Sequence, residues 1–184
     1  MKLIHCADIH LDSPMQTHMT AQQASVRNTE MLQSFVRLTE FAQERAVRAV
    51  LIAGDLFDGA RVRARTVDAL LAAIRRTPEV DYLYLPGNHD EAANAFCDCA
   101  LPGNLKLFGK TWSTVQYDGI AISGVQIGAD AALYETLPHT DGAVNLVMLH
   151  GGIGTACGED MINLNLLKNR GIDYLALGHL HTYQ

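Results

Sequence analysis

Five short apolar runs of the sequence each lead into a segment that bears Asp, Asn or His. In chain order, the five motifs contain Asp8 and His10; Asp55 and Asp58; Asn88, His89 and Asp90; His150; and His179 and His181. Carboxylate oxygens, imidazole nitrogens and an amide oxygen together form a donor set that suits Mn²⁺, Fe²⁺ and Zn²⁺. The residue types therefore predict a centre for divalent cations, and two neighbouring cations can clamp a phosphate and activate water.

The spacing within the motifs supports a shared centre. Alternate residues of an extended segment lie on one side, so a D-x-H or H-x-H pair directs both side chains the same way. Glycines such as Gly54 and Gly87 stand beside the donors and allow a close approach of the backbone, and the carboxylate of Asp55 could bridge two cations. Each motif alone occurs by chance, whereas all five, in this order and at strand ends, favour a common site.

The elements that must position these motifs alternate between strands and helices. We expect strands at 2–7, 49–53, 82–85, 105–108, 112–117, 120–125, 145–149 and 174–177, and helices at 27–45, 65–76 and 161–169. Such alternation predicts an α/β fold in which an early, mainly parallel sheet packs face to face against a later mixed sheet, with helices outside. The carboxyl ends of parallel strands gather at one edge, where ligands bind.

Composition limits the classes of function. A chain of 184 residues suits one compact domain, and a net charge of −6 argues against gripping nucleic acid by bulk charge alone. It has neither a signal peptide nor an apolar stretch near the ~20 residues of a membrane span, which predicts a cytoplasmic location and no membrane contact. Cys97 and Cys99 are expected to be reduced thiols, with metal binding or redox sensing as the alternative.

The order of the motifs, D-x-H, GD-x-x-D, GNHD, H-G and GH-x-H, resembles the calcineurin-like metallophosphoesterase superfamily. The segments LIHCADIHLDSP, LIAGDLFD and LALGHLHTYQ are more narrowly similar to the SbcD/YhaO-type DNA repair exonucleases, which are bacterial relatives of the meiotic recombination nuclease. The resemblance extends from Asp8 to His181 and implies a four-layer α/β/β/α sandwich. We expect residues 1–184 to form the catalytic domain, truncated at the C-terminus because the sequence stops three residues after His181.

The resemblance also implies roles for the donor residues. Asp8, His10 and His181 would hold one metal ion; Asn88, His150 and His179 would hold the other; and Asp55 would bridge the two. Two divalent ions are implied, with Mn²⁺ favoured over Fe²⁺ and Zn²⁺. His89 would act as the acid toward the leaving oxygen, and Asp90 and Asp58 would orient its ring; for Asp58, capping of its own loop is the alternative.

Partners follow from the same resemblance and from a basic run of residues. Arg61, Arg63 and Arg65 could contact the phosphates of DNA, although a solvated helix start is the simpler explanation. The resemblance implies an SMC-like ATPase partner that docks on segments missing here, a missing DNA-capping domain, and a homodimer formed through the early helices. His5, His18 and His139 match no motif.

Three functions are compatible with these features. The first is a DNA exonuclease or endonuclease of DNA repair that hydrolyses phosphodiesters with His89 as acid. The alternative is a small-molecule phosphodiesterase or phosphatase acting on cyclic nucleotides or nucleotides, which the acidic pI of about 5.7 favours slightly. A non-catalytic scaffold is the third, and it is disfavoured because every expected ligand position is filled.

Overall fold

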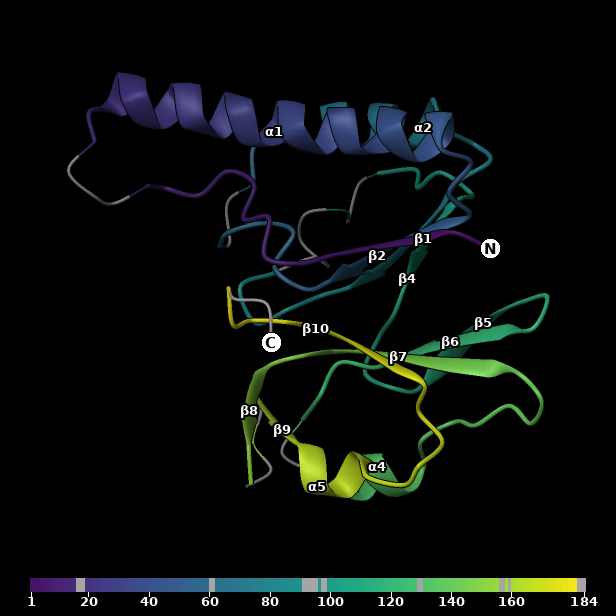
Figure 1. Cartoon of the computed structure of the whole chain (residues 1–184). Coiled ribbons are helices and arrows are strands. Elements are labelled where there is room, and N and C mark those ends of the chain that lie inside the picture. Colours follow the sequence, from purple (N-terminus) through teal and green to yellow (C-terminus); the bar gives the residue numbers. More distant parts are fainter. Residues whose placement is uncertain are drawn as a thin grey trace.

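Four layers of secondary structure make up the chain. The computed structural model describes residues 1–15, 19–59, 62–90, 96, 99–128, 131–155, 158 and 160–181. Two long helices cover the outer face of one sheet, a second sheet packs against its inner face, and two short helices lie beneath the second sheet (Figure 1). The expected α/β fold with two packed sheets and outer helices is thereby confirmed.

The first sheet is entirely parallel, with the strand order β1-β2-β3-β4. Its strands are β1 (Leu3–Cys6), β2 (Ala49–Ala53), β3 (Asp81–Leu85) and β4 (Leu105–Leu107). Strands β2 and β3 are buried along their whole length. Because all four strands run the same way, the loops that follow β1, β2 and β3 leave from one edge of the sheet.

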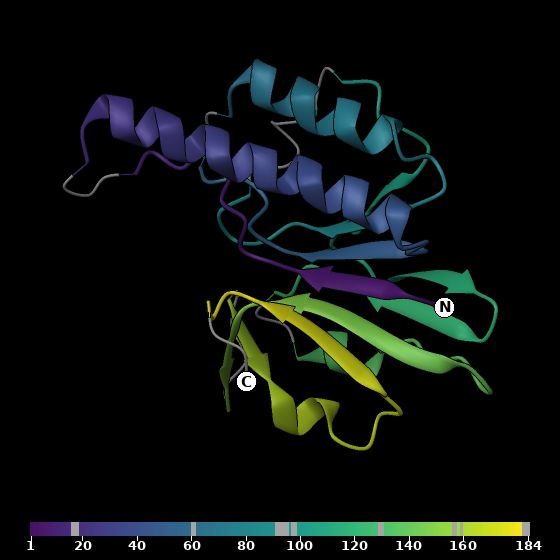
Figure 2. The same cartoon turned by 45° about the horizontal axis from the view of Figure 1, so that its top comes forward.

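The second sheet is mixed, with the order β10-β7-β6-β5. Its strands are β5 (Ser113–Tyr117), β6 (Ile120–Gly124), β7 (Val144–His150) and β10 (Tyr174–Gly178). Strand β5 alone is antiparallel to its neighbour, whereas β6, β7 and β10 are parallel. The edge strands β1 and β10 lie on the same side of the molecule (Figure 2).

Period-two alternation along the central strands explains the layering. In β2, Val50 and Ile52 pack into the core beneath the long helices, whereas Ala49, Leu51 and Ala53 pack between the sheets. In β7, Leu146 and Met148 join the core between the sheets, and Val147 and Leu149 face the core over the short helices. Apolar residues on both faces of these strands are what a sheet buried on both sides requires.

The helices differ from the expectation mainly at their starts. Helix α1 (Ala21–Glu44) begins six residues before the expected Arg27, because Thr20 and Gln23 form a capping box that satisfies its first turn. Helix α2 (Ala64–Arg75) matches the expected helix within one residue at each end. No helix of the described ranges combines the length and apolar character needed to cross a bilayer.

The expected helix over 161–169 is wrong. Residues Met161–Asn163 form β9, which pairs with β8 (Gly152–Gly154) in a small separate sheet, and only α5 (Leu164–Leu167) is helical. The side chain of Asn163 accepts a hydrogen bond from the backbone N–H of Asn165 and so starts the helix three residues later than expected. Helix α4 (Ala132–Glu135) was not predicted either.

Burial between the two sheets provides a test of this packing. Leu51 is 1% exposed in the core between the sheets, so Leu51→Ala should lower the free energy of unfolding by about 2–5 kcal/mol through lost burial and a cavity. Leu107, on β4, is 42% exposed, and Leu107→Ala should change the free energy of unfolding by about 0.5 kcal/mol or less. Urea unfolding of both variants measures the difference, and equal losses would contradict the layering.

Candidate metal centre

The loops at the carboxyl ends of the parallel strands bring the expected donors together. Asp8 and His10 follow β1, Asp55 follows β2, and Asn88 follows β3, all from the first sheet. The last residue of β7 is His150, and His179 and His181 follow β10, all from the second sheet. Asp8 and His179, which are 171 residues apart in the sequence, therefore meet where the two sheets share an edge.

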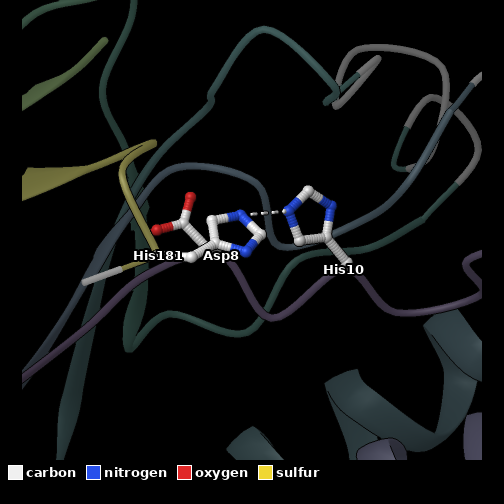
Figure 3. Close-up of side chains that lie close together, drawn as sticks. All are labelled: Asp8, His10 and His181. Atoms are coloured by element: carbon white, nitrogen blue, oxygen red, sulfur yellow. Dashed lines mark hydrogen bonds between the residues drawn. The ribbon is translucent and has the colours of Figure 1, made fainter. Parts of the chain in front are cut away.

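The first donor group consists of Asp8, His10 and His181. One donor atom from each lies within 4.8 Å of the others. Nε2 of His10 is 3.3 Å from Nε2 of His181, and the carboxylate of Asp8 lies beside them (Figure 3). Two imidazole nitrogens that face each other beside a carboxylate suit a shared cation, because each neutral ring can offer it a lone pair.

The second group consists of Asp55, His150 and His179, whose donor atoms also lie within 4.8 Å of one another. Nε2 of His150 is 3.1 Å from the amide Oδ1 of Asn88 and 3.2 Å from Oδ2 of Asp55. Nδ1 of His150 is 2.9 Å from the carbonyl oxygen of Ala53, to which it can donate its proton. That tautomer turns the Nε2 lone pair toward two oxygens, an arrangement that requires a cation or a proton between them.

Asp55 connects the two groups. Its Oδ2 atom is 3.2 Å from Nε2 of His150 and 3.8 Å from Nε2 of His10, and the side chain is 2% exposed. Burial acts to raise the pKa of Asp55 and to lower that of His150, but their hydrogen bond and opposite charges outweigh it. The pKa of Asp55 is thus lowered and that of His150 raised, as expected for a carboxylate placed to bridge cationic partners.

His89 lies at the exposed side of the first group. Its ring packs edge-on against His10, with a centroid distance of 5.4 Å, and its backbone N–H donates to Oδ1 of Asp55 at 3.0 Å. Nδ1 of His89 is 3.2 Å from Oδ1 of Asp58, which is the contact expected of an orienting carboxylate. Asp58 can thereby fix the ring and leave Nε2 as the nitrogen available to a substrate.

Asp90 takes a different place from the expected one. Its carboxylate accepts hydrogen bonds from the backbone N–H groups of Leu56 at 3.1 Å, Phe57 at 2.7 Å and Gly87 at 2.9 Å. Burial raises the pKa of Asp90 more than these hydrogen bonds lower it. Asp90 thus joins the loop of Asp55 to the loop of Asn88, rather than binding the ring of His89.

The two described arginines of the basic run, Arg63 and Arg65, have different surroundings. The guanidinium group and backbone N–H of Arg63 bind the carboxylate of Asp12, a partner that the sequence analysis did not identify. Arg65 is exposed in the first turn of α2, so a role in phosphate contact remains a prediction for it. Arg61, His18 and Cys97 lie outside the described residues, and the predictions for them stand untested.

Backbone conformation at the donors could not be predicted. Four expected ligands have positive φ values: Asp8 (54°), His10 (50°), Asp55 (50°) and His179 (98°). Such conformations are costly for residues with a side chain and persist only where surrounding contacts impose them. Here the backbone N–H of Asp8 donates to the carbonyl oxygen of Gly54 at 3.0 Å. The backbone N–H of His179 donates to both carboxylate oxygens of Asp8, at 2.8 Å to Oδ1 and 3.0 Å to Oδ2.

The first donor group is open to solvent. A cavity of about 550 Å³ adjoins Asp8 and His181 along β1 and β10, and its walls include Ile153, Tyr174 and Leu180. His5 also lines it, and its Nδ1 is 2.9 Å from the hydroxyl of Tyr174. His5 is therefore a strand residue outside both donor groups, as expected for a histidine that matches no motif.

Comparison with known proteins gives a consistent picture. The family model described as calcineurin-like phosphoesterase matches residues 1–183. The chain is 27% identical over 202 residues to the uncharacterized metallophosphoesterase YhaO of Bacillus subtilis, covering 100% of this chain and 49% of that protein. It is 25% identical over 210 residues to the DNA double-strand break repair protein Mre11 of Methanopyrus kandleri, covering 99% of this chain and 45% of that protein.

A solved structure and the relative lengths complete the comparison. The crystal structure of the Pseudomonas putida nuclease MPE superposes with a TM-score of 0.35 at 18% identity, covering 79% of this chain and 58% of that one. The chain spans about half the length of the curated relatives it matches.

Close packing at Gly87 offers a test of the centre. A Cβ atom at Gly87 would lie 2.2 Å from Oδ1 of Asp55 and 2.8 Å from Nε2 of His150, so Gly87→Ala must displace one of these donors. We expect Gly87→Ala to weaken Mn²⁺ binding by about tenfold or more, measured by isothermal titration calorimetry. Gly103 has open space at its Cβ position, and Gly103→Ala should leave the affinity unchanged; equal affinities in both variants would contradict the placement of Asp55 and His150.

Proposed function

The chain belongs to the calcineurin-like phosphoesterase family, and from this premise we propose that it hydrolyses phosphodiester bonds of DNA with two divalent cations, preferentially Mn²⁺. The observation that carries the proposal is the pair of donor groups joined by Asp55, with His89 beside them. Its relatives include proteins named for DNA double-strand break repair. DNA as the substrate is supported by these names, by the resemblance to SbcD/YhaO-type DNA repair exonucleases, and by the exposure of Arg65.

Each residue of the centre has a role in this proposal. Asp8, His10 and His181 would hold one cation; Asn88, His150 and His179 the other; and Asp55 both. The bound cations would supply positive charge to the phosphate and lower the pKa of a water molecule. The hydrogen bond of His150 to Ala53 holds that ring in place, and Asp90 keeps the loops of Asp55 and Asn88 together.

His89 would supply the proton for the leaving group. Departure of a sugar oxygen from phosphorus leaves negative charge on that oxygen, and protonation by a positioned imidazole removes it. The ring lies at the solvent side of the first donor group, half exposed, and Asp58 binds its Nδ1 atom. Nε2 could therefore deliver its proton to the leaving oxygen while Asp58 keeps the ring in the orientation required.

The second candidate, a small-molecule phosphodiesterase or phosphatase, is favoured by one structural observation. The guanidinium group of Arg63 binds the carboxylate of Asp12, so the charge of Arg63 is less available to the phosphates of DNA. Hydrolysis of single-stranded DNA, cyclic AMP and p-nitrophenyl phosphate should be compared in Mn²⁺. We expect DNA to be cleaved with the largest kcat/KM; turnover of cyclic AMP or the monoester without DNA cleavage would overturn the proposed substrate.

Substitution of His89 tests the acid. We expect His89→Asn to lower kcat on DNA by about 10²–10⁴-fold while the affinity for Mn²⁺ stays within twofold. Asp58→Asn should lower kcat less, and the double variant should be no worse than His89→Asn, because Asp58 acts through that ring. His139→Asn changes an exposed histidine outside the centre and should keep full activity. Unchanged turnover in His89→Asn would exclude it as the acid.

Substitution of Arg65 tests the phosphate contact. If Arg65 binds the backbone of single-stranded DNA, Arg65→Ala should raise KM for DNA and reduce the slope of log affinity against log salt by about 0.7. Hydrolysis of bis(p-nitrophenyl) phosphate, which has no flanking phosphates, should be unaffected. Arg27→Ala, which changes an exposed arginine on α1, serves as the control. A salt slope equal to that of wild type would remove Arg65 from the DNA surface.

The wider assembly belongs to the same proposal. We infer that the whole protein carries further segments that bind an SMC-like ATPase and cap DNA, and that residues 1–184 form its catalytic domain. The homodimer through the early helices and the cytoplasmic location also stay predictions. The half-length match to the curated relatives is compatible with such further segments.

A further inference from the structure

Asp12 forms a buried network immediately after the first ligand motif. Its side chain is 4% exposed. Its carboxylate accepts hydrogen bonds from the backbone N–H of Arg63 at 2.8 Å, from Nε of Arg63 at 2.8 Å and from Oγ1 of Thr66 at 3.0 Å, and Nη2 of Arg63 also binds it. A buried charge is stable only when it is paired and hydrogen-bonded, and Asp12 satisfies both conditions.

The guanidinium group of Arg63 and the carboxylate of Asp12 also form a salt bridge, and the Asp12 side chain is 4% exposed. Removing one partner of such a pair leaves an uncompensated charge, which costs more than the pair itself contributes. Arg63 is therefore committed to Asp12 and is poorly placed to bind a substrate phosphate at the same time.

The network lies at the end of a backbone ladder that carries His10. The backbone N–H groups of His10 and Leu11 donate to the backbone carbonyl oxygens of Asp55 and Leu56, both at 2.9 Å. The backbone N–H of Asp58 donates to the carbonyl oxygen of Leu11 at 3.0 Å. After Leu11 the ladder ends, and the carboxylate of Asp12 connects the chain to α2. His10 and Asp12 both have left-handed backbones, with φ of 50° and 63°. Both conformations need contacts on each side to persist.

We propose that Asp12, bound by Arg63 and Thr66, is a positioning residue that keeps His10 in its ligating conformation. Arg63 then serves the cation centre instead of the DNA surface that the sequence analysis predicted for it. The inference rests on the proposed metal centre but not on DNA as the substrate.

The two roles of Arg63 predict different patterns. As a phosphate contact, Arg63→Ala would raise KM for DNA alone, and Asp12→Asn would leave Mn²⁺ affinity unchanged. As part of the network, Arg63→Ala and Asp12→Asn would both weaken Mn²⁺ binding and lower kcat on bis(p-nitrophenyl) phosphate. Because the two residues would act as one unit, the double variant should be within twofold of the worse single variant.

The experiment measures Mn²⁺ affinity by isothermal titration calorimetry on the full chain, with melting temperatures recorded in EDTA. We expect Asp12→Asn and Arg63→Ala each to weaken Mn²⁺ binding by about 10–100-fold, the usual effect of losing a group that orients a ligand. Arg63→Lys keeps the charge but not the planar fork, and it should recover part of the affinity. If Arg63→Ala fails to fold, the test uses Asp12→Asn and Arg63→Lys. Asp12→Asn keeps the shape of the carboxylate, and Arg63→Lys keeps the positive charge.

A matched control separates positioning from stability. Asp81 is a largely buried carboxylate paired with Nη1 of Arg48 at 3.1 Å, at the opposite ends of the strands from the donors. Asp81→Asn should lower the melting temperature and leave Mn²⁺ affinity within twofold of wild type. If Asp12→Asn behaves like Asp81→Asn, or if Arg63→Ala raises only KM for DNA, the proposal is overturned.

The same titration distinguishes this inference from the proposed function. A wild-type chain that binds Mn²⁺ but leaves DNA intact would overturn the substrate alone, and the affinities of the variants would still decide the role of Asp12. A wild-type chain without measurable Mn²⁺ affinity would overturn both proposals.

Discussion

The carboxylate of Asp55 is the charge around which the centre is arranged. A carboxylate with 2% of its side chain exposed cannot rely on water, so the protein must supply its partners. Three come from different segments: the backbone N–H of His89, the ring of His150 and, at 3.8 Å, the ring of His10. Those three contacts tie the loops after β1 and β3 and the end of β7 to the loop after β2. Loss of this one charge would remove the side chain that contacts both donor groups.

Beside the donors the two sheets approach each other closely because glycines occupy two positions there. A Cβ at Gly54 would lie 1.9 Å from Nδ1 of His150, and one at Gly178 would lie 2.0 Å from the carbonyl oxygen of Ala53. The ring of His150 fills this space from β7 and donates toward β2. His150 thus belongs to the second donor group and also connects the two sheets, so the proposed metal site and the sheet packing depend on the same side chain.

The sequence was most informative where a short apolar run leads into a donor residue. The apolar runs in 49–53 and 145–149 predicted strands, which the structure confirms, and the donors that follow such runs lie close together at one edge. It failed at 161–169, where a short strand precedes a single helical turn. The contact between Asp12 and Arg63 was not predicted, because the two residues are 51 positions apart and no periodic pattern connects them. The left-handed backbones of Asp8, His10 and Asp55 arise from tertiary contacts, so local propensity could not indicate them.

The wide spacing of the donors along the chain has a consequence for biosynthesis. His10 and His181 are 171 residues apart, and β10, which positions His179 and His181, is the last strand of the second sheet to leave the ribosome. During translation the nascent chain holds only part of each donor group until β10 has been made. Because β10 pairs with β7 in register, its docking on β7 brings the last two donors to the shared edge. Both donor groups are therefore completed by the final strand of the second sheet.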